Sequence, residues 1–136
     1  MGQREEAMQD LDRALRLAPG SEHAHLLAAS LARQLNRFDA AADSYRRALA
    51  INPYNSEYHH GVAYACFRGQ DWKGACEAAT AALELNPARL DTRRVLIWSL
   101  LRRGRTTEAG AEFDRFRAFR SADEETVASW FGPGVP

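Results

Sequence analysis

The chain has 136 residues, of which 46% are apolar, and this length suits one compact domain or a short array of repeats. Its 18 lysines and arginines equal its 18 aspartates and glutamates, so it lacks the bulk positive charge that favours binding to nucleic acid or to anionic membranes. The longest apolar stretch, near residues 95–101, is far too short to cross a bilayer, and the acidic N-terminus lacks the apolar core of a secretory signal.

The apolar residues recur at helical spacing along the chain, and no stretch alternates as a strand would. A single helix is predicted first, over residues 3–18. Three helix pairs are predicted next, at 22–34 with 38–51, at 56–67 with 72–85, and at 90–103 with 107–119. A short helix over residues 126–131 comes last, before a Gly-Pro-Gly stop. The fold class is therefore predicted to be all-α.

A recurring motif ends the lone first helix and the second helices of the first two pairs. The motif is ALRLAP at Pro19, ALAINP at Pro53 and ALELNP at Pro87. Pro53 follows Pro19 by 34 residues (53 − 19), and Pro87 follows Pro53 by 34 (87 − 53). Proline cannot continue a helix, and it disfavours the helical conformation in the residue before it. Alanines recur five and twelve residues before each proline, which predicts close approach between neighbouring helices.

The 34-residue period, the Ala–aromatic–Ala–Pro series and the aromatic residue that opens a second helix (Phe38, Trp72) resemble the tetratricopeptide repeat. This resemblance implies a right-handed α-α superhelix of helix-turn-helix pairs, in which first helices line the concave side and second helices form the outer side. It divides the chain into the second helix of a truncated repeat (1–21), repeats at 22–55 and 56–89, a divergent repeat at 90–121, and a capping helix with a tail (122–136).

The sequence departs from the family pattern at several positions. The early tryptophan position of the repeat holds His25, His59 and Arg93. In the third repeat, Phe116 replaces the usual alanine and Ser121 stands where proline is expected. We therefore expect the close helix contact of the third repeat to be altered, as a terminal repeat tolerates.

The two ends of the array are expected to differ. Residues 3–18 form a lone outer helix, and a short helix without a partner is marginal in water. We expect either fraying before about residue 6 or a homodimer through this edge. At the other end, Ser121 and Glu124 match a capping box. The following helix carries Val127, Trp130 and Phe131, which we expect to cover the open face of the last repeat.

Two adjacent histidines, His59 and His60, are weak candidates for a metal site. Neighbouring helical residues point about 100° apart, so the two side chains cannot hold one ion together. His59 occupies the same repeat position as His25, which indicates packing between helices, whereas His60 falls on the stripe that faces the concave side. No metal ligand and no cofactor are predicted.

Catalytic patterns are also missing, and the chain is predicted not to be an enzyme. Ser30, Ser44 and Ser99 lie in helical stretches without a nucleophile elbow, and no glycine-rich loop follows a strand. Cys66 falls at a core position and Cys76 near one, which favours buried, inert thiols. The basic run from Arg102 to Arg105 is offset by nearby glutamates and is typical of a solvated turn rather than a nucleic-acid site.

The candidate binding site is a set of stripes on the three first helices. Successive positions at i, i+4 and i+7 give Leu26, Ser30, Arg33, His60, Tyr64, Phe67, Arg94, Trp98 and Leu101. Phe67 and Leu101 could equally pack between repeats. Tyr64 and Trp98 occupy one repeat position beside His60 and Arg94, and aromatic residues with neighbouring arginines often supply the binding energy of an interface. We expect both to be partly exposed, with Arg94 favouring acidic or C-terminal ligands.

One known subclass of the family is disfavoured. Members that clamp a C-terminal carboxylate use lysine and asparagine at positions where this chain has Leu26 with Ser30 and His60 with Tyr64.

The sequence thus predicts a scaffold that binds a protein or peptide ligand in the concave groove, with neither nucleic acid nor membrane as its partner. Two alternatives stay open: a regulatory or assembly segment of a larger enzyme whose catalytic domain lies outside this chain, and a module for self-association.

Overall fold

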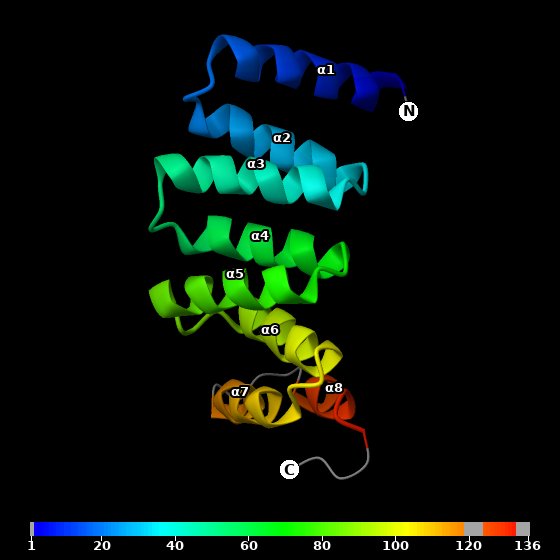
Figure 1. Ribbon diagram of the computed structural model, residues 1–136, viewed down its shortest axis with the longest axis vertical. Coiled ribbons are helices and arrows are strands. Elements are labelled where there is room, and N and C mark those ends of the chain that lie inside the picture. The colour runs from blue at the N-terminus through cyan, green and yellow to red at the C-terminus, as the bar shows by residue number, and fades with distance from the viewer. Residues whose placement is uncertain (1, 119–123, 133–136) are drawn as a thin grey trace.

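The computed structural model of the chain describes residues 2–118 and 124–132. These residues form helices and no strand. The helices are α1 (Gly2–Leu17), α2 (Glu22–Gln34), α3 (Phe38–Ile51), α4 (Ser56–Arg68), α5 (Trp72–Leu85), α6 (Leu90–Arg102), α7 (Thr106–Ala118) and α8 (Glu124–Ser129). They stack one after another along the longest axis, with α1 at one end of the stack and α7 and α8 at the other (Figure 1).

The predicted helix boundaries agree closely with the structure. The predictions for α2, α3 and α5 match to the residue, and those for α4 and α6 differ by one residue at the C-terminal end. Helix α1 begins and ends one residue earlier than predicted. Helix α7 begins one residue earlier than predicted, and residue 119, its predicted end, lies outside the described residues. Helix α8 begins and ends two residues earlier than predicted. Ser121, half of the predicted capping box, also lies outside the described residues.

Side chains at the starts of three helices explain these boundaries. The Ser21 hydroxyl accepts from the Ala24 amide, Asn55 accepts from the amides of Glu57 and Tyr58, and Asp71 accepts from the Gly74 amide. Such caps satisfy amides that have no partner within the helix, each stabilising the helix by about 1 kcal/mol.

The turns inside the three pairs each contain one residue in the left-handed backbone conformation. Asn36, Gln70 and Gly104, each one repeat apart, have φ angles of 58°, 64° and 75°. Asparagine and glycine adopt this left-handed conformation readily, whereas glutamine does so at a cost. Gly69 lies just before the left-handed residue of its turn, and a Cβ built on it would lie 3.3 Å from the Phe38 Cβ.

Small residues let the helices approach closely, as the repeat pattern predicts. Ala41, Ala48, Ala75, Ala82 and Ala109 are fully buried between neighbouring helices. Between α3 and α4, the Tyr45 ring packs directly over Gly61, at a distance that leaves no room for a Cβ on that glycine. The core therefore runs along the stack as a chain of pairwise interfaces.

The C-terminal end of the stack is closed by aromatic side chains. Phe113 and Phe116 of α7 are buried and their ring centroids lie 6.5 Å apart, and Phe131 lies 5.3 Å from Phe113. Val127 of α8 is fully buried against this cluster. Phe116 thus replaces the usual alanine with a ring that α8 covers, which agrees with the altered contact expected in the third repeat.

Within the part of the chain that the structure describes, no helix combines the length and the apolar character needed to cross a membrane.

Candidate binding site

The first helices of the three pairs, α2, α4 and α6, run across the stack in roughly the same direction (Figure 1). We call the surface that they present the groove face. All nine predicted site residues lie on these helices, and none of them is buried. Arg33 and Arg94 are exposed, and the other seven are half-buried. Tyr64 and Trp98 are thus partly accessible, as expected from the sequence.

The centre of the groove face is a cluster around one tyrosine. Arg33, His60, Tyr64 and Arg68 line an open pocket of about 350 Å³, and we call them the Tyr64 cluster. The guanidinium carbons of Arg33 and Arg68 lie 5.9 and 5.8 Å from the centroid of the Tyr64 ring. Arg68 also donates to the Tyr64 hydroxyl oxygen, at 3.0 Å. Two cations therefore flank one aromatic ring.

His60 is held by the neighbouring repeat. Its Nδ1 lies 2.8 Å from the Thr92 hydroxyl, and its Nε2 lies 3.4 Å from the Asp91 carboxylate. Burial lowers the pKa of His60 below 6.5, and this effect outweighs the opposing attraction of Asp91. The imidazole is consequently neutral at neutral pH. It positions the Tyr64 ring, whose centroid lies 6.2 Å away, while the arginines carry the positive charge.

Trp98 lies elsewhere. Its ring packs edge-on against Trp130, just beyond α8, with 5.1 Å between centroids. Within the described residues, no ring contact joins Trp98 to the Tyr64 cluster. Truncating Trp98 would therefore also disturb the C-terminal cap, which makes Tyr64 the cleaner probe of the groove face.

The structure brings together only part of the predicted set. Arg33, His60 and Tyr64 meet in the Tyr64 cluster, and Phe67 adjoins it with its ring 6.2 Å from Tyr64. Leu26, Ser30, Arg94 and Leu101 lie on the same helices but do not line this pocket. Arg68 was missed from the sequence, although it follows Tyr64 by one helical turn and this spacing could have indicated it.

The histidines at the early tryptophan position of the repeat have a structural role. His25 Nε2 bonds the Pro19 carbonyl at 2.8 Å, and His59 Nε2 bonds the Pro53 carbonyl at 3.0 Å. Arg93 donates to the Pro87 carbonyl at 2.6 Å. One repeat position thus ties three first helices to the turns that precede them. His25 is buried and His59 is half-buried, and the hydrogen-bond partner of each lies in the preceding turn rather than on a neighbouring helix.

Other chemistry-bearing side chains are not assembled into a site. Cys66 and Cys76 are free and buried, and burial raises the pKa of both thiols. Among the described residues, no group of three or more histidines, cysteines, aspartates or glutamates is placed to hold a metal ion.

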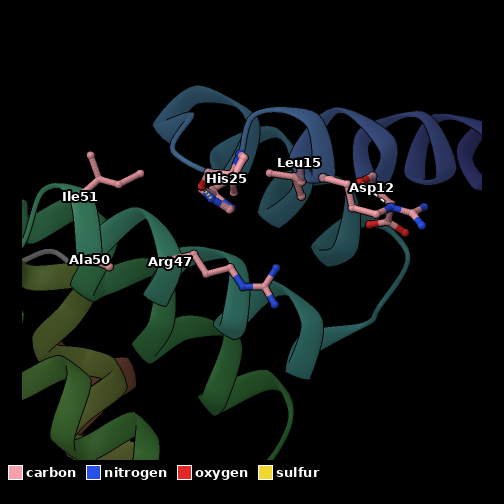
Figure 2. A pocket seen from close by; sticks show the side chains of 8 residues that line it. Asp12, Leu15, His25, Arg47, Ala50 and Ile51 are labelled. Carbon is pink, nitrogen blue, oxygen red and sulfur yellow. Dashed lines mark hydrogen bonds between the residues drawn. The ribbon is translucent and has the colours of Figure 1, made fainter.

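Another hollow lies between α1 and α3. It is lined by Asp12, Leu15, Arg16, Pro19, His25, Arg47, Ala50 and Ile51. Side chains from α1 and α2 meet those of α3 across it (Figure 2). Its charges are of both signs, and the His25 Nε2 is already used by Pro19. This hollow therefore favours no particular class of ligand, whereas the Tyr64 cluster presents two arginines beside one aromatic ring.

Comparison with known proteins adds a family and a fold. A family model described as Tetratricopeptide repeat matches residues 1–56 and 63–124. Among solved structures, a crystal structure of MamA is similar with a TM-score of 0.84 and 15% identity, over 96% of this chain and 76% of that chain. MamA 41-end from Desulfovibrio magneticus RS-1 is similar with a TM-score of 0.76 and 19% identity, over 90% of this chain and 70% of that chain.

A third similar structure is YrrB, described as a TPR protein with an unusual peptide-binding site. Its TM-score is 0.81 at 20% identity, over 96% of this chain and 67% of that chain. At these identities the likeness shows the fold alone. No curated protein matches the chain.

Proposed function

Because the chain belongs to the tetratricopeptide repeat family, we propose that it acts as a protein- or peptide-binding scaffold through its groove face. The observation that carries this proposal is the Tyr64 cluster, where a half-buried aromatic ring lies in an open pocket between α2 and α4. Aromatic and arginine side chains in such settings supply most of the energy of protein interfaces. The similar fold of YrrB, a protein described by its peptide-binding site, is in keeping with this role.

The proposed site comprises the Tyr64 cluster together with the rest of the predicted stripe. Leu26 and Ser30 extend it along α2, and Arg94 and Leu101 extend it along α6. Trp98 belongs to the stripe by position, although it also supports α8. In this proposal the repeats are 22–55, 56–89 and 90–121, so a ligand would lie across successive first helices.

A random-peptide library selected on the immobilised protein tests the proposal. Enriched peptides should bind the wild-type chain, and Tyr64→Ala should lower their affinity by roughly thirtyfold, which corresponds to about 2 kcal/mol. Tyr54→Ala is a matched control, because Tyr54 is 82% exposed in a turn between repeats. Melting temperatures of both variants show whether either substitution disturbs the fold.

The proposal fails if no peptide is enriched that depends on Tyr64. It also fails if Tyr54→Ala weakens the enriched peptides as much as Tyr64→Ala does.

A second candidate function is self-association through α1. The observation that favours it is that α1 contributes no buried residue, and that Ala14 and Leu17 are exposed. Light scattering across a range of protein concentrations tests it: a mass that stays at that of one chain excludes a dimer through this edge.

A further inference from the structure

The charges of the first helices are arranged by helix end. Each first helix has an acidic residue in its first turn and an arginine in its last turn. This order matches the helix dipole, which favours acids at the N-terminus and bases at the C-terminus. Because α2, α4 and α6 run in the same direction (Figure 1), the two signs separate across the groove face. We call Glu22, Glu57 and Asp91 the acidic rim, and Arg33, Arg68 and Arg102 the basic rim.

The acidic rim is compensated by its neighbours. The Tyr58 hydroxyl donates to Glu22, and Arg89 lies 3.7 Å from the Glu57 carboxylate and 3.2 Å from that of Asp91. His60 adds a second contact to Asp91. These carboxylates therefore have partners within the chain.

The basic rim is not compensated in this way. Across residues 2–118 and 124–132, none of its three arginines forms an ion pair with an acidic side chain. Each guanidinium instead lies over an aromatic ring. Arg33 lies over Tyr64, Arg68 over Tyr64 and over Phe38 at 5.0 Å, and Arg102 over Trp72 at 5.4 Å.

Helix dipoles and aromatic rings orient these arginines without neutralising them. A ring contacts the face of a guanidinium and leaves the N–H groups in the guanidinium plane available to an acceptor. Arg68 uses one nitrogen on the Tyr64 hydroxyl and keeps its other N–H groups for a ligand. All three arginines are exposed. The chain has no net charge overall, yet one edge of the groove face carries three cations that have no carboxylate partner among the described residues.

We propose that the ligand of the groove face is an acidic peptide segment, with its Asp or Glu carboxylates along the basic rim and one of them at the Tyr64 cluster. This inference rests on the proposed function and names its ligand class. Guanidinium groups bind carboxylates through paired, charge-assisted hydrogen bonds.

Peptides enriched from the library on the wild-type chain provide the probe. They should be rich in aspartate and glutamate. Replacing the glutamates of one synthesised enriched peptide by glutamine should weaken its binding to the chain. The double variant Arg33→Gln with Arg68→Gln should lose roughly a hundredfold in affinity, about tenfold for each arginine. Binding should also weaken as salt concentration rises.

A double variant with the same change in charge provides the control. Arg13 and Arg47 are exposed on α1 and α3, away from the groove face, so Arg13→Gln with Arg47→Gln should leave the affinity nearly unchanged. Equal losses in the two double variants would overturn the inference, because they would reflect overall charge alone.

Enriched peptides that depend on Tyr64 but are neutral or basic would overturn this inference while leaving the proposed function in place. Binding that requires phosphoserine in place of glutamate would overturn it as well. If no Tyr64-dependent peptide is enriched, the proposed function fails and this inference fails with it.

Discussion

The two ends of the helical stack are built differently. Helix α1 at the N-terminal end contributes no buried residue, and Leu17 is 81% exposed. At the C-terminal end, Phe113, Phe116 and Val127 are 2% exposed or less. In a repeat array each unit buries its apolar face only on its neighbours. The comparison shows that large side chains under a short helix can bury the apolar face of a repeat, as a neighbouring repeat does.

The residues of α1 explain its weaker packing. Ala7 and Leu11 are half-buried and Ala14 is exposed, whereas alanines at the corresponding positions of α3 and α5 are fully buried between two neighbours. An ion pair from Glu5 to Arg37, at 3.1 Å, also ties α1 to the next pair, but both side chains are 51% exposed. Local stability should therefore rise from the N-terminal end toward the C-terminal end.

The largest expected effect is the loss of an aromatic ring from the C-terminal end. Phe116→Ala should lower the free energy of unfolding by about 3–5 kcal/mol, because it leaves a cavity under α8. Leu17→Ala, at the exposed end of α1, should change it by less than about 0.5 kcal/mol. Urea unfolding measures both, and similar losses would contradict the difference between the ends.

Two ion pairs sharpen the same comparison. The guanidinium of Arg93 lies 2.5 Å from Glu112, and their side chains are 6% and 16% exposed. Glu112→Ala leaves Arg93 buried with one partner fewer and should cost about 2–3 kcal/mol. Glu5→Ala, which breaks the exposed pair with Arg37, should cost less than about 1 kcal/mol.

A double variant isolates the charge effect. Arg93→Met combined with Glu112→Met should recover much of the stability that Glu112→Ala loses, since no unpaired charge is then buried. If the double variant is no more stable than Glu112→Ala, the loss comes from packing instead.

A smaller difference should appear in amide hydrogen exchange. Amides of α1 should be protected at least about tenfold less than those of α4, which corresponds to about 1.4 kcal/mol in opening free energy. Exchange should be followed at low protein concentration, where association is weakest. Equal protection of α1 and α4 in a chain shown to be monomeric would contradict the predicted gradient.

The pH dependence of stability should show a small effect of His60, in the middle of the stack. The folded-state pKa of His60 lies below 6.5 because of burial, so the unfolded chain binds this proton more readily. The contribution of His60 is therefore complete above about pH 6.5 and is lost as pH falls through the folded-state pKa.

His60→Gln should consequently be less sensitive than the wild type to mild acid in urea unfolding. Asp91 limits the effect, since it lies 3.4 Å from the imidazole and attracts the protonated form. Burial raises the pKa of Asp91, but His60, the Thr92 amide and Arg89 together hold it below 3.8, so Asp91 remains charged throughout this range. If the variant loses as much stability in mild acid as the wild type does, the pKa of His60 does not change on unfolding.

Much of the candidate site lay beyond sequence reasoning. The stripe at i, i+4 and i+7 selected Arg33, His60 and Tyr64 from helical periodicity alone, and the structure brings these three together. It also selected Trp98, whose environment depends on Trp130, a residue 32 positions later beside a short helix. Arg68 was missed because the spacing of four residues shows only that it neighbours Tyr64 on α4. The spacing does not show that Arg33 of α2 lies over the same ring.

The helices and their period follow from the order of the residues alone. Pro53 and Pro87 end helices whatever surrounds them, and Ser21, Asn55 and Asp71 cap helix starts through contacts two or three residues away. These are local effects of backbone geometry and hydrogen bonding, so they can be found from the residues in order.

The pairing of charges among the described residues depends on the arrangement of the helices in space. The sequence gives equal numbers of acids and bases, but Arg89 reaches Glu57 from the following repeat, while Arg33 and Arg68 meet at one tyrosine. Pairing of this kind depends on how successive first helices align in space. The strength of an interaction between two charges depends on the distance between them and on their burial. The basic rim is therefore a property of the stack and not of any one repeat.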